Sequence, residues 1–180
     1  RSLISHLDKR RKLYLGVFAI GFVSGYPIAE MIIEWLLDSE GYIPVGVEVI
    51  ILQPLEVILL QLRIAVQIAF GLTIAAIILD LSWAGSGSFP GAAARLSRGS
   101  GTTRVVSAML TVAALGAMGL VYAHNVLIPF LLQYLAEDSA ASGLQSTWQL
   151  QSWVGFITGL YFSSVLGFQV PILAVLLLRS

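Results

Sequence analysis

The sequence contains no cysteine and little charge of either sign. Without cysteine there is no disulfide framework, no Cys-x-x-Cys redox pair and no thiolate metal site. Only 11% of the 180 residues are charged, against about a quarter in soluble domains, whereas 57% are hydrophobic. This balance excludes an ordinary soluble domain and indicates a protein whose apolar surface faces lipid.

The absence of several catalytic and binding motifs excludes further classes of function. The two histidines, His6 and His124, are far apart in sequence and neither belongs to an HExxH pattern. No GxSxG elbow occurs, and "GSGSFPG" at 85–91 is neither a Walker loop nor a dinucleotide fingerprint. Few basic residues lie away from the ends of apolar segments, so nucleic-acid binding has no support. We expect no enzymatic activity, no cofactor and no metal site.

Four apolar segments are long enough to cross a bilayer, which takes roughly 20 residues. The expected fold is an all-α, polytopic transmembrane helical bundle that forms a single domain over residues 1–180. Its spans are predicted at 13–37, 55–82, 105–136 and 149–178. Residues 1–12 form the N-terminal segment, and residues 83–104 form the loop between the second and third spans.

Charge predicts the orientation. Nine of the ten basic residues lie before the first span, between the second and third spans, or after the fourth. Most acidic residues lie at the other ends of the spans: Glu30, Glu34, Asp38, Glu40, Glu48, Glu137 and Asp138. By the positive-inside rule, the N-terminus is cytoplasmic and the protein is a multi-pass protein of the cell membrane.

Two segments depart from a simple span. Glu30, Glu34 and Asp38 recur every four residues, so the end of the first segment is expected to be an amphipathic cap on the outer surface. The third segment is longer than a bilayer requires. Pro129 near its outer end is expected to kink it or let it protrude.

Three polar residues stand inside apolar segments. Glu56 and Arg63 are seven residues apart on one helix face, which allows a mutual or water-bridged contact. Arg63 has either a functional or packing role, or snorkels toward the outer surface. Gln169, roughly 15 Å by helical rise from Arg179, is expected to bond helices together rather than to carry protons.

The basic run "RRKLYL" at 10–15 followed by an apolar segment is loosely similar to a twin-arginine export signal. No small-x-small cleavage site follows, and three more spans come after it. We therefore expect a permanent basic anchor rather than a removable signal.

Five stretches, in order along the chain, carry a resemblance to the TatC family, the membrane receptor of the twin-arginine translocase. "SLISHLDKRRKLYL" resembles the family's opening HLxELRxRL, with His6, Leu7 and Arg11 in place. Lys9 stands at the family's glutamate, and Asp8 offers a carboxylate one residue earlier.

The other four stretches lie in the later spans and the loop. "QPLEVILLQLRIAV" resembles the start of the family's second span, with Pro54, Glu56 and Arg63 at motif positions. "FPGAAARLSR" resembles its first cytoplasmic loop, and "HNVLIPFLLQYL" its third span. "SVLGFQVPILAVLLL" resembles its fourth span, with Gln169 at the glutamate. The motif residues in these last three stretches are Phe89, Pro90, Gly91, Pro129, Phe168 and Pro171, whereas the loop glutamate falls on Leu96.

The resemblance implies a non-enzymatic component of the translocase, which binds twin-arginine signal peptides of folded precursor proteins at the cytoplasmic face. It also implies single-span partners of the TatA and TatB type, an oligomer, and transport driven by the proton gradient. The signal-binding residues that it implies are His6, Leu7, Asp8, Lys9, Arg11, Phe89, Pro90 and Gly91. Family members have six spans, so a fragment is expected.

Two alternatives remain. The substitutions at Lys9 and Leu96 allow a degenerate scaffold that no longer binds the signal. Half of a secondary small-solute transporter is the other alternative, for which a buried charge such as Arg63 would be the local evidence.

Overall fold

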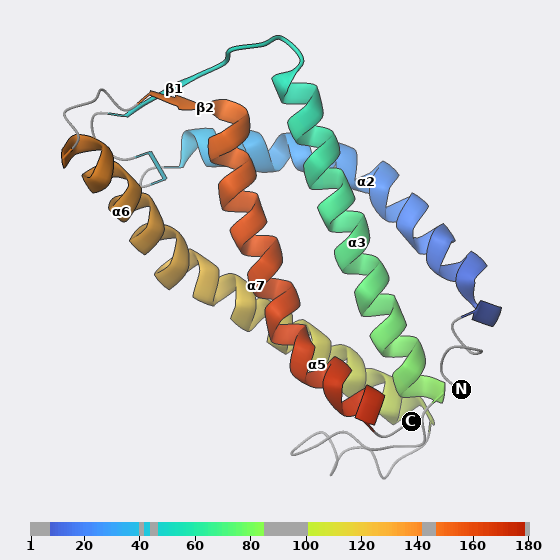
Figure 1. Cartoon of the computed structure of the whole chain (residues 1–180). Coiled ribbons are helices and arrows are strands. Elements are labelled where there is room, and N and C mark those ends of the chain that lie inside the picture. The colour runs from blue at the N-terminus through green and yellow to red at the C-terminus, as the bar shows by residue number, and fades with distance from the viewer. Residues whose placement is uncertain (1–7, 40–41, 44–46, 85–100, 142–146, 179–180) are drawn as a thin grey trace.

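The chain forms four long helices and one small sheet in a computed structural model (Figure 1). The structure describes residues 8–39, 42–43, 47–84, 101–141 and 147–178. Its elements in order are α2 (Arg11–Asp38), β1 (Glu48–Ile50), α3 (Glu56–Ala84), α5 (Gly101–Tyr122), the π-helix η1 (Ala123–Leu127), α6 (Ile128–Ala141), β2 (Thr147–Gln149) and α7 (Leu150–Leu178).

The four predicted spans agree with the helices. Four helical stretches of the described chain are long and apolar enough to cross a membrane: Arg11–Asp38, Glu56–Asp80, Val106–Ser139 and Leu150–Ala174. In Figure 1 the start of α2 lies at the opposite end of the bundle from the strands. We call these the basic end, which carries Lys9 to Lys12, and the sheet end, which carries β1 and β2.

Helix α2 is continuous to Asp38, so the acidic stripe does not belong to a separate element. Figure 1 shows α2 running beside α3 and then turning behind α7. Pro27 lies inside this helix, and an internal proline removes a hydrogen bond and bends the axis. Beyond the proline, Ala29 and Ile33 are buried against the bundle, whereas the acidic residues are exposed. The acidic stripe is therefore on the second half of the first helix, beyond Pro27.

The third span has a local irregularity in the turn before Pro129, the residue that we expect to kink the segment or let it protrude. Residues Ala123–Leu127 form a π-helix between α5 and α6. Pro129 has no N–H to donate to the preceding turn, and a π turn is one way in which a helix accommodates such a lost bond. The helix continues through α6, so the long third segment is one continuous helix with a π-helical turn inside it.

Glycines set the closest helix contacts. A Cβ at Gly21 of α2 would lie 3.0 Å from Ala69 Cα of α3, and one at Gly25 would lie 3.2 Å from Ala65 Cα. A Cβ at Gly119 of α5 would lie 2.9 Å from the Ser164 carbonyl oxygen of α7. Because only a residue without Cβ permits these approaches, glycine brings α2 to α3 and α5 to α7.

Two small strands join the loops at the sheet end, which an all-α prediction did not include. Strands β1 and β2 are parallel, with Glu48 opposite Thr147 and Ile50 opposite Gln149. They connect the segment that follows α2 to the segment that precedes α7 (Figure 1). The four-helix bundle is thus closed at one end by backbone pairing.

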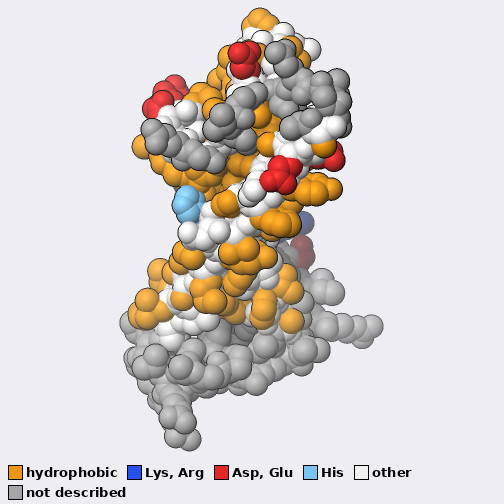
Figure 2. All heavy atoms as spheres, turned by 90° about the vertical axis from the view of Figure 1, so that its left-hand side faces the viewer, with side chains coloured by type: hydrophobic (Ala, Val, Ile, Leu, Met, Phe, Trp, Pro, Cys, Tyr) orange, Lys and Arg blue, Asp and Glu red, His pale blue; other side chains and the backbone are white. Residues whose placement is uncertain are grey.

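Acidic and hydrophobic side chains are distributed differently along the axis of the bundle. Figure 2 shows acidic side chains toward the sheet end and hydrophobic side chains over the middle of the visible face. Many large apolar side chains in the helices are exposed, Ile20, Val23, Leu110 and Phe130 among them. Such a surface is suited to lipid and not to water.

The predicted orientation can be tested with single cysteines, because the chain has none of its own. We expect Ser139→Cys, near the end of α6, to react with a membrane-impermeant maleimide added outside spheroplasts. Ser97→Cys, in the predicted cytoplasmic loop, should react only after permeabilisation. The reverse labelling pattern would show that the N-terminus is outside.

Candidate functional site

The predicted signal-binding face is only partly described. Asp8, Lys9 and Arg11 lie at the basic end and are exposed. His6, Leu7, Phe89, Pro90 and Gly91 lie outside the described residues. Asp8 Oδ1 lies 3.6 Å from Arg11 Nη1, and both side chains are largely exposed. The carboxylate that we expected to receive a signal arginine is therefore adjacent to an arginine of the chain itself.

A second carboxylate at this end was not predicted. Asp80 of α3 accepts a hydrogen bond from Arg10 Nη1 at 2.7 Å and another from the Tyr14 hydroxyl at 2.7 Å. Its side chain is only 11% exposed. The one sequence signal was an acidic residue close to the end of an apolar span. The structure thus adds Arg10, Tyr14 and Asp80 to the candidate face.

Glu56 is explained by the start of α3. Its side chain is 1% exposed, and Oε1 accepts hydrogen bonds from the backbone N–H groups of Leu52 and Gln53, each at 3.1 Å. It also accepts one from Gln149 Nε2 at 2.6 Å, whereas Oε2 has no partner. Pro54 stands in the turn before the helix, where its missing N–H costs nothing. The Pro-x-Glu pattern is therefore a helix start in which a glutamate reaches back to cap the chain.

Glu56 and Arg63 do not pair with each other, so the contact that their spacing allowed is not formed. Arg63 instead crosses to α7, where a Cβ at Gly155 would lie 2.6 Å from Arg63 Nη1. Among the described residues, no carboxylate forms an ion pair with Arg63. Gly155 therefore makes room for a guanidinium rather than for a helix backbone, which favours a packing role for Arg63.

Gln169 joins two helices. Its Nε2 donates to the Val112 carbonyl oxygen of α5 at 2.9 Å, and its side chain is 5% exposed. Gly116 of α5 lies beside this amide, and a Cβ there would stand at ordinary van der Waals distance, 3.6 Å, from Nε2. The neighbouring Phe168 ring packs against Tyr122 of α5 at a centroid distance of 6.0 Å. These contacts support the interhelical role that the sequence favoured, and Pro171 lies inside α7 one turn or less beyond them.

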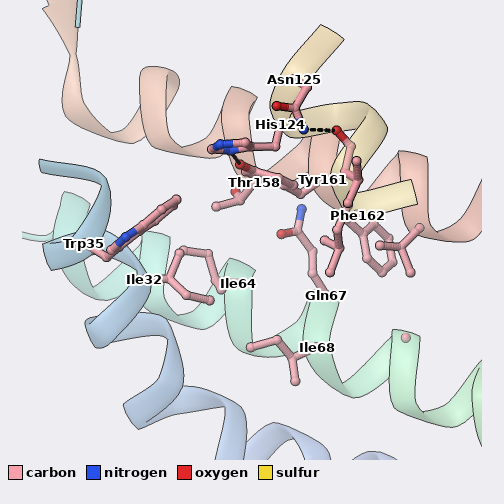
Figure 3. Close-up of a pocket in the computed structure, with 14 residues that line it drawn as sticks. Ile32, Trp35, Ile64, Gln67, Ile68, His124, Asn125, Thr158, Tyr161 and Phe162 are labelled. Carbon is pink, nitrogen blue, oxygen red and sulfur yellow. Dashed lines mark hydrogen bonds between the residues drawn. The ribbon is translucent and has the colours of Figure 1, made fainter. Parts of the chain in front are cut away.

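An apolar cavity of about 580 Å³ opens in the middle of the bundle. Figure 3 shows side chains from α2, α3, η1 and α7 converging on it. Its walls are mainly aliphatic and aromatic, as at Ile32, Ile64 and Phe162. Its polar groups are amides, hydroxyls, one imidazole and one indole N–H, from Trp35, Gln67, His124, Asn125, Thr158 and Tyr161. Among the described residues that line it, none has a permanently charged side chain.

Three aromatic side chains form a polar cluster at the edge of the cavity. Tyr42 Oη lies 2.8 Å from His124 Nδ1 and 2.7 Å from Tyr161 Oη, and Nδ1 lies 2.9 Å from that same Oη. Trp153 Nε1 donates to the Tyr42 carbonyl oxygen at 3.1 Å, and the Trp35 ring meets the Tyr42 ring edge-on. Tyr42 therefore connects the segment after α2 to η1 and α7.

Metal ligands do not gather around His124. Within the described ranges, no group of three or more histidine and acidic side chains is placed to hold a metal ion. The Tyr42 and Tyr161 hydroxyls instead lie within hydrogen-bond distance of the imidazole Nδ1. The cluster is thus a hydrogen-bonded contact between three segments.

Comparison with known proteins identifies the chain's relatives. The TatC family model, described as Sec-independent protein translocase protein (TatC), matches residues 2–180. A curated protein of Synechocystis sp., named Sec-independent protein translocase protein TatC, is 27% identical over 180 residues. That match covers 98% of this chain and 65% of the relative's length. No solved structure matches the chain.

The cap at the start of α3 gives a testable prediction for stability. Glu56→Leu leaves the two amides and Gln149 without their acceptor, and we expect it to lower the stability of the folded state by at least about 2 kcal/mol. Glu56→Gln keeps an acceptor oxygen and should cost less than half as much. Thermal unfolding in micelles, followed by tryptophan fluorescence, measures both. Equal losses for the two variants would mean that the negative charge, and not the acceptor, is what α3 requires.

Proposed function

The chain belongs to the TatC family, and from this premise we propose that it is a component of the Sec-independent, twin-arginine translocase. It is a multi-pass membrane protein and not an enzyme. The observation that carries the proposal is the family match, which extends over residues 2–180. The chain spans 65% of the length of the Synechocystis relative. The activity of a complete translocase protein is therefore proposed for this chain and does not follow from the match alone.

The proposed task is to bind the twin-arginine signal peptide of a folded precursor at the basic end. Carboxylates suit this task because a guanidinium binds them with two parallel hydrogen bonds and a defined orientation. Asp8 and Asp80 supply carboxylates at this end, and the predicted loop residues Phe89, Pro90 and Gly91 follow α3 in sequence. The remaining residues proposed to contribute are His6, Leu7, Lys9 and Arg11.

The proposed partners are single-span proteins of the TatA and TatB type, in an oligomer held in the cell membrane. The exposed apolar side chains of the four helices and the apolar walls of the cavity support contacts with other helices. A solute transporter is less well supported. The cavity offers no charged side chain to bind a polar solute, and Arg63 lies over Gly155 and does not line the cavity.

Site-specific crosslinking tests signal binding. A photoreactive phenylalanine derivative replaces Leu7 or Phe89, which are apolar and leave the carboxylates in place. We expect both probes to crosslink a twin-arginine signal peptide in membranes and to crosslink a twin-lysine peptide much less, because an ammonium lacks the planar fork of a guanidinium.

The matched control carries the same probe at Phe130, which is exposed near the start of α6 and is separated from the basic end by the whole of α5 and η1. This position should crosslink neither peptide. If the Leu7 and Phe89 probes also capture neither peptide in a correctly inserted protein, the chain does not read the signal, and a scaffold role beside a competent partner becomes the better account.

A further inference from the structure

The basic end contains two carboxylates, and each lies against one of two adjacent arginines of the chain itself. Arg10 Nη1 lies 2.7 Å from Asp80 Oδ1, and Arg11 Nη1 lies 3.6 Å from Asp8 Oδ1. All other acidic residues of the described chain lie in the second half of α2, in β1, at the start of α3 or in α6. A guanidinium that arrives at this end therefore meets carboxylates that already hold guanidinium groups.

Asp80 is the stronger of the two acceptors. Its side chain is 11% exposed, whereas the side chain of Asp8 is mostly in solvent. A carboxylate that is largely shielded from water interacts more strongly with a cation than an exposed one does. Tyr14 donates to its Oδ2 and so fixes the plane of the carboxylate. Asp80 is thus a preformed acceptor for a positively charged hydrogen-bond donor.

Arg10 is held in a way that permits exchange. Its side chain is 49% exposed, and its Nη1 donates a hydrogen bond to Asp80 Oδ1. Because half of the Arg10 side chain is in solvent, water and salt screen its attraction to Asp80 more than in a pair with both partners buried. A second guanidinium can replace Arg10 with little loss, because Arg10 then returns to water.

The pair is not needed to hold α2 against α3. These two helices already make close contact at Gly21 and Gly25, where their backbones approach Ala69 and Ala65. Those contacts lie about two and three turns along the helix from Tyr14 and are independent of any charge. The Arg10 contact therefore has little structural role to explain it.

We propose that Asp80 is a binding carboxylate for an arginine of the signal peptide, and that the chain's own Arg10 and Arg11 occupy Asp80 and Asp8 until the ligand displaces them. This inference rests on the proposed function, since it names the residues at which the signal's guanidinium groups bind. The internal pair resembles the ligand chemically. Because Arg10 and Arg11 compete with the peptide for the two carboxylates, a peptide must bind tightly enough to displace them. The competition therefore selects for peptides that offer two guanidinium groups.

Binding of a labelled twin-arginine peptide to the purified chain in lipid nanodiscs tests the proposal. We expect Arg10→Gln to bind about fivefold more tightly than Lys12→Gln, because releasing Asp80 from a half-exposed ion pair frees roughly that factor. Lys12→Gln is the matched control: it removes the same charge from an exposed neighbour of Arg10. Asp80→Asn should abolish the gain when combined with Arg10→Gln, and a twin-lysine peptide should show no gain in any variant.

Three results would overturn the proposal. Equal affinities for Arg10→Gln and Lys12→Gln would mean that Arg10 acts only through bulk charge. Weaker binding by Arg10→Gln would mean that Arg10 is a structural tether or a ligand contact itself. If the gain in affinity from Arg10→Gln persists when Asp80→Asn is also present, the carboxylate that Arg10 occupies is not Asp80. Circular dichroism of each variant in the same nanodiscs verifies that the helices remain folded.

The two proposals fail in different ways. If the unmodified chain prefers the twin-arginine peptide but Arg10→Gln does not bind it more tightly, the proposal of signal binding stands. The proposal that Arg10 occupies the binding carboxylate is then wrong. If neither the unmodified chain nor any variant binds the peptide, both are wrong for this chain.

Discussion

The start of a helix leaves backbone N–H groups without partners in the helix, and at the sheet end the buried carboxylate of Glu56 accepts hydrogen bonds from two adjacent amides before α3 and from Gln149. Leu52 and Gln53 belong to the segment that enters α3, and Gln149 belongs to the strand that leads into α7. One side chain therefore fixes the start of α3 and its position relative to α7. The parallel pairing of β1 with β2 adds backbone hydrogen bonds to the same junction.

The cavity follows from how the helices are paired. Glycines bring α2 to α3 and α5 to α7, and buried clusters fill the two ends of the bundle around Leu60 and Val154 and around Ile78 and Ile172. The cavity of about 580 Å³ borders the first of these clusters, whose Ile64 forms part of its wall, and extends along Gln67, Gly71 and Phe162. The Tyr42 cluster lies at its edge on the side of the sheet.

The sequence predicted the spans well, because twenty apolar residues in a row have few other uses. It predicted individual contacts less well. Spacing placed Glu56 and Arg63 on one helix face, but it could not say that unpaired amides lie before Glu56 or that a glycine of α7 lies beside Arg63. Tyr42 and Asp80 were missed for a similar reason. Their partners are 66 to 119 residues away in sequence, and a hydroxyl or a carboxylate gives no sign of a partner so distant.

The β1–β2 pairing also sets an order of assembly. β1 precedes the second span in the chain, and its partner β2 follows the third. A ribosome completes α3, α5 and α6 before it makes the strand that pairs with β1 and the Gln149 amide that contacts Glu56. Until then, β1 has no strand to pair with, and Glu56 accepts hydrogen bonds from the Leu52 and Gln53 amides but not from Gln149. The sheet end therefore closes late in synthesis, because β2 becomes available only after the three earlier spans have been made.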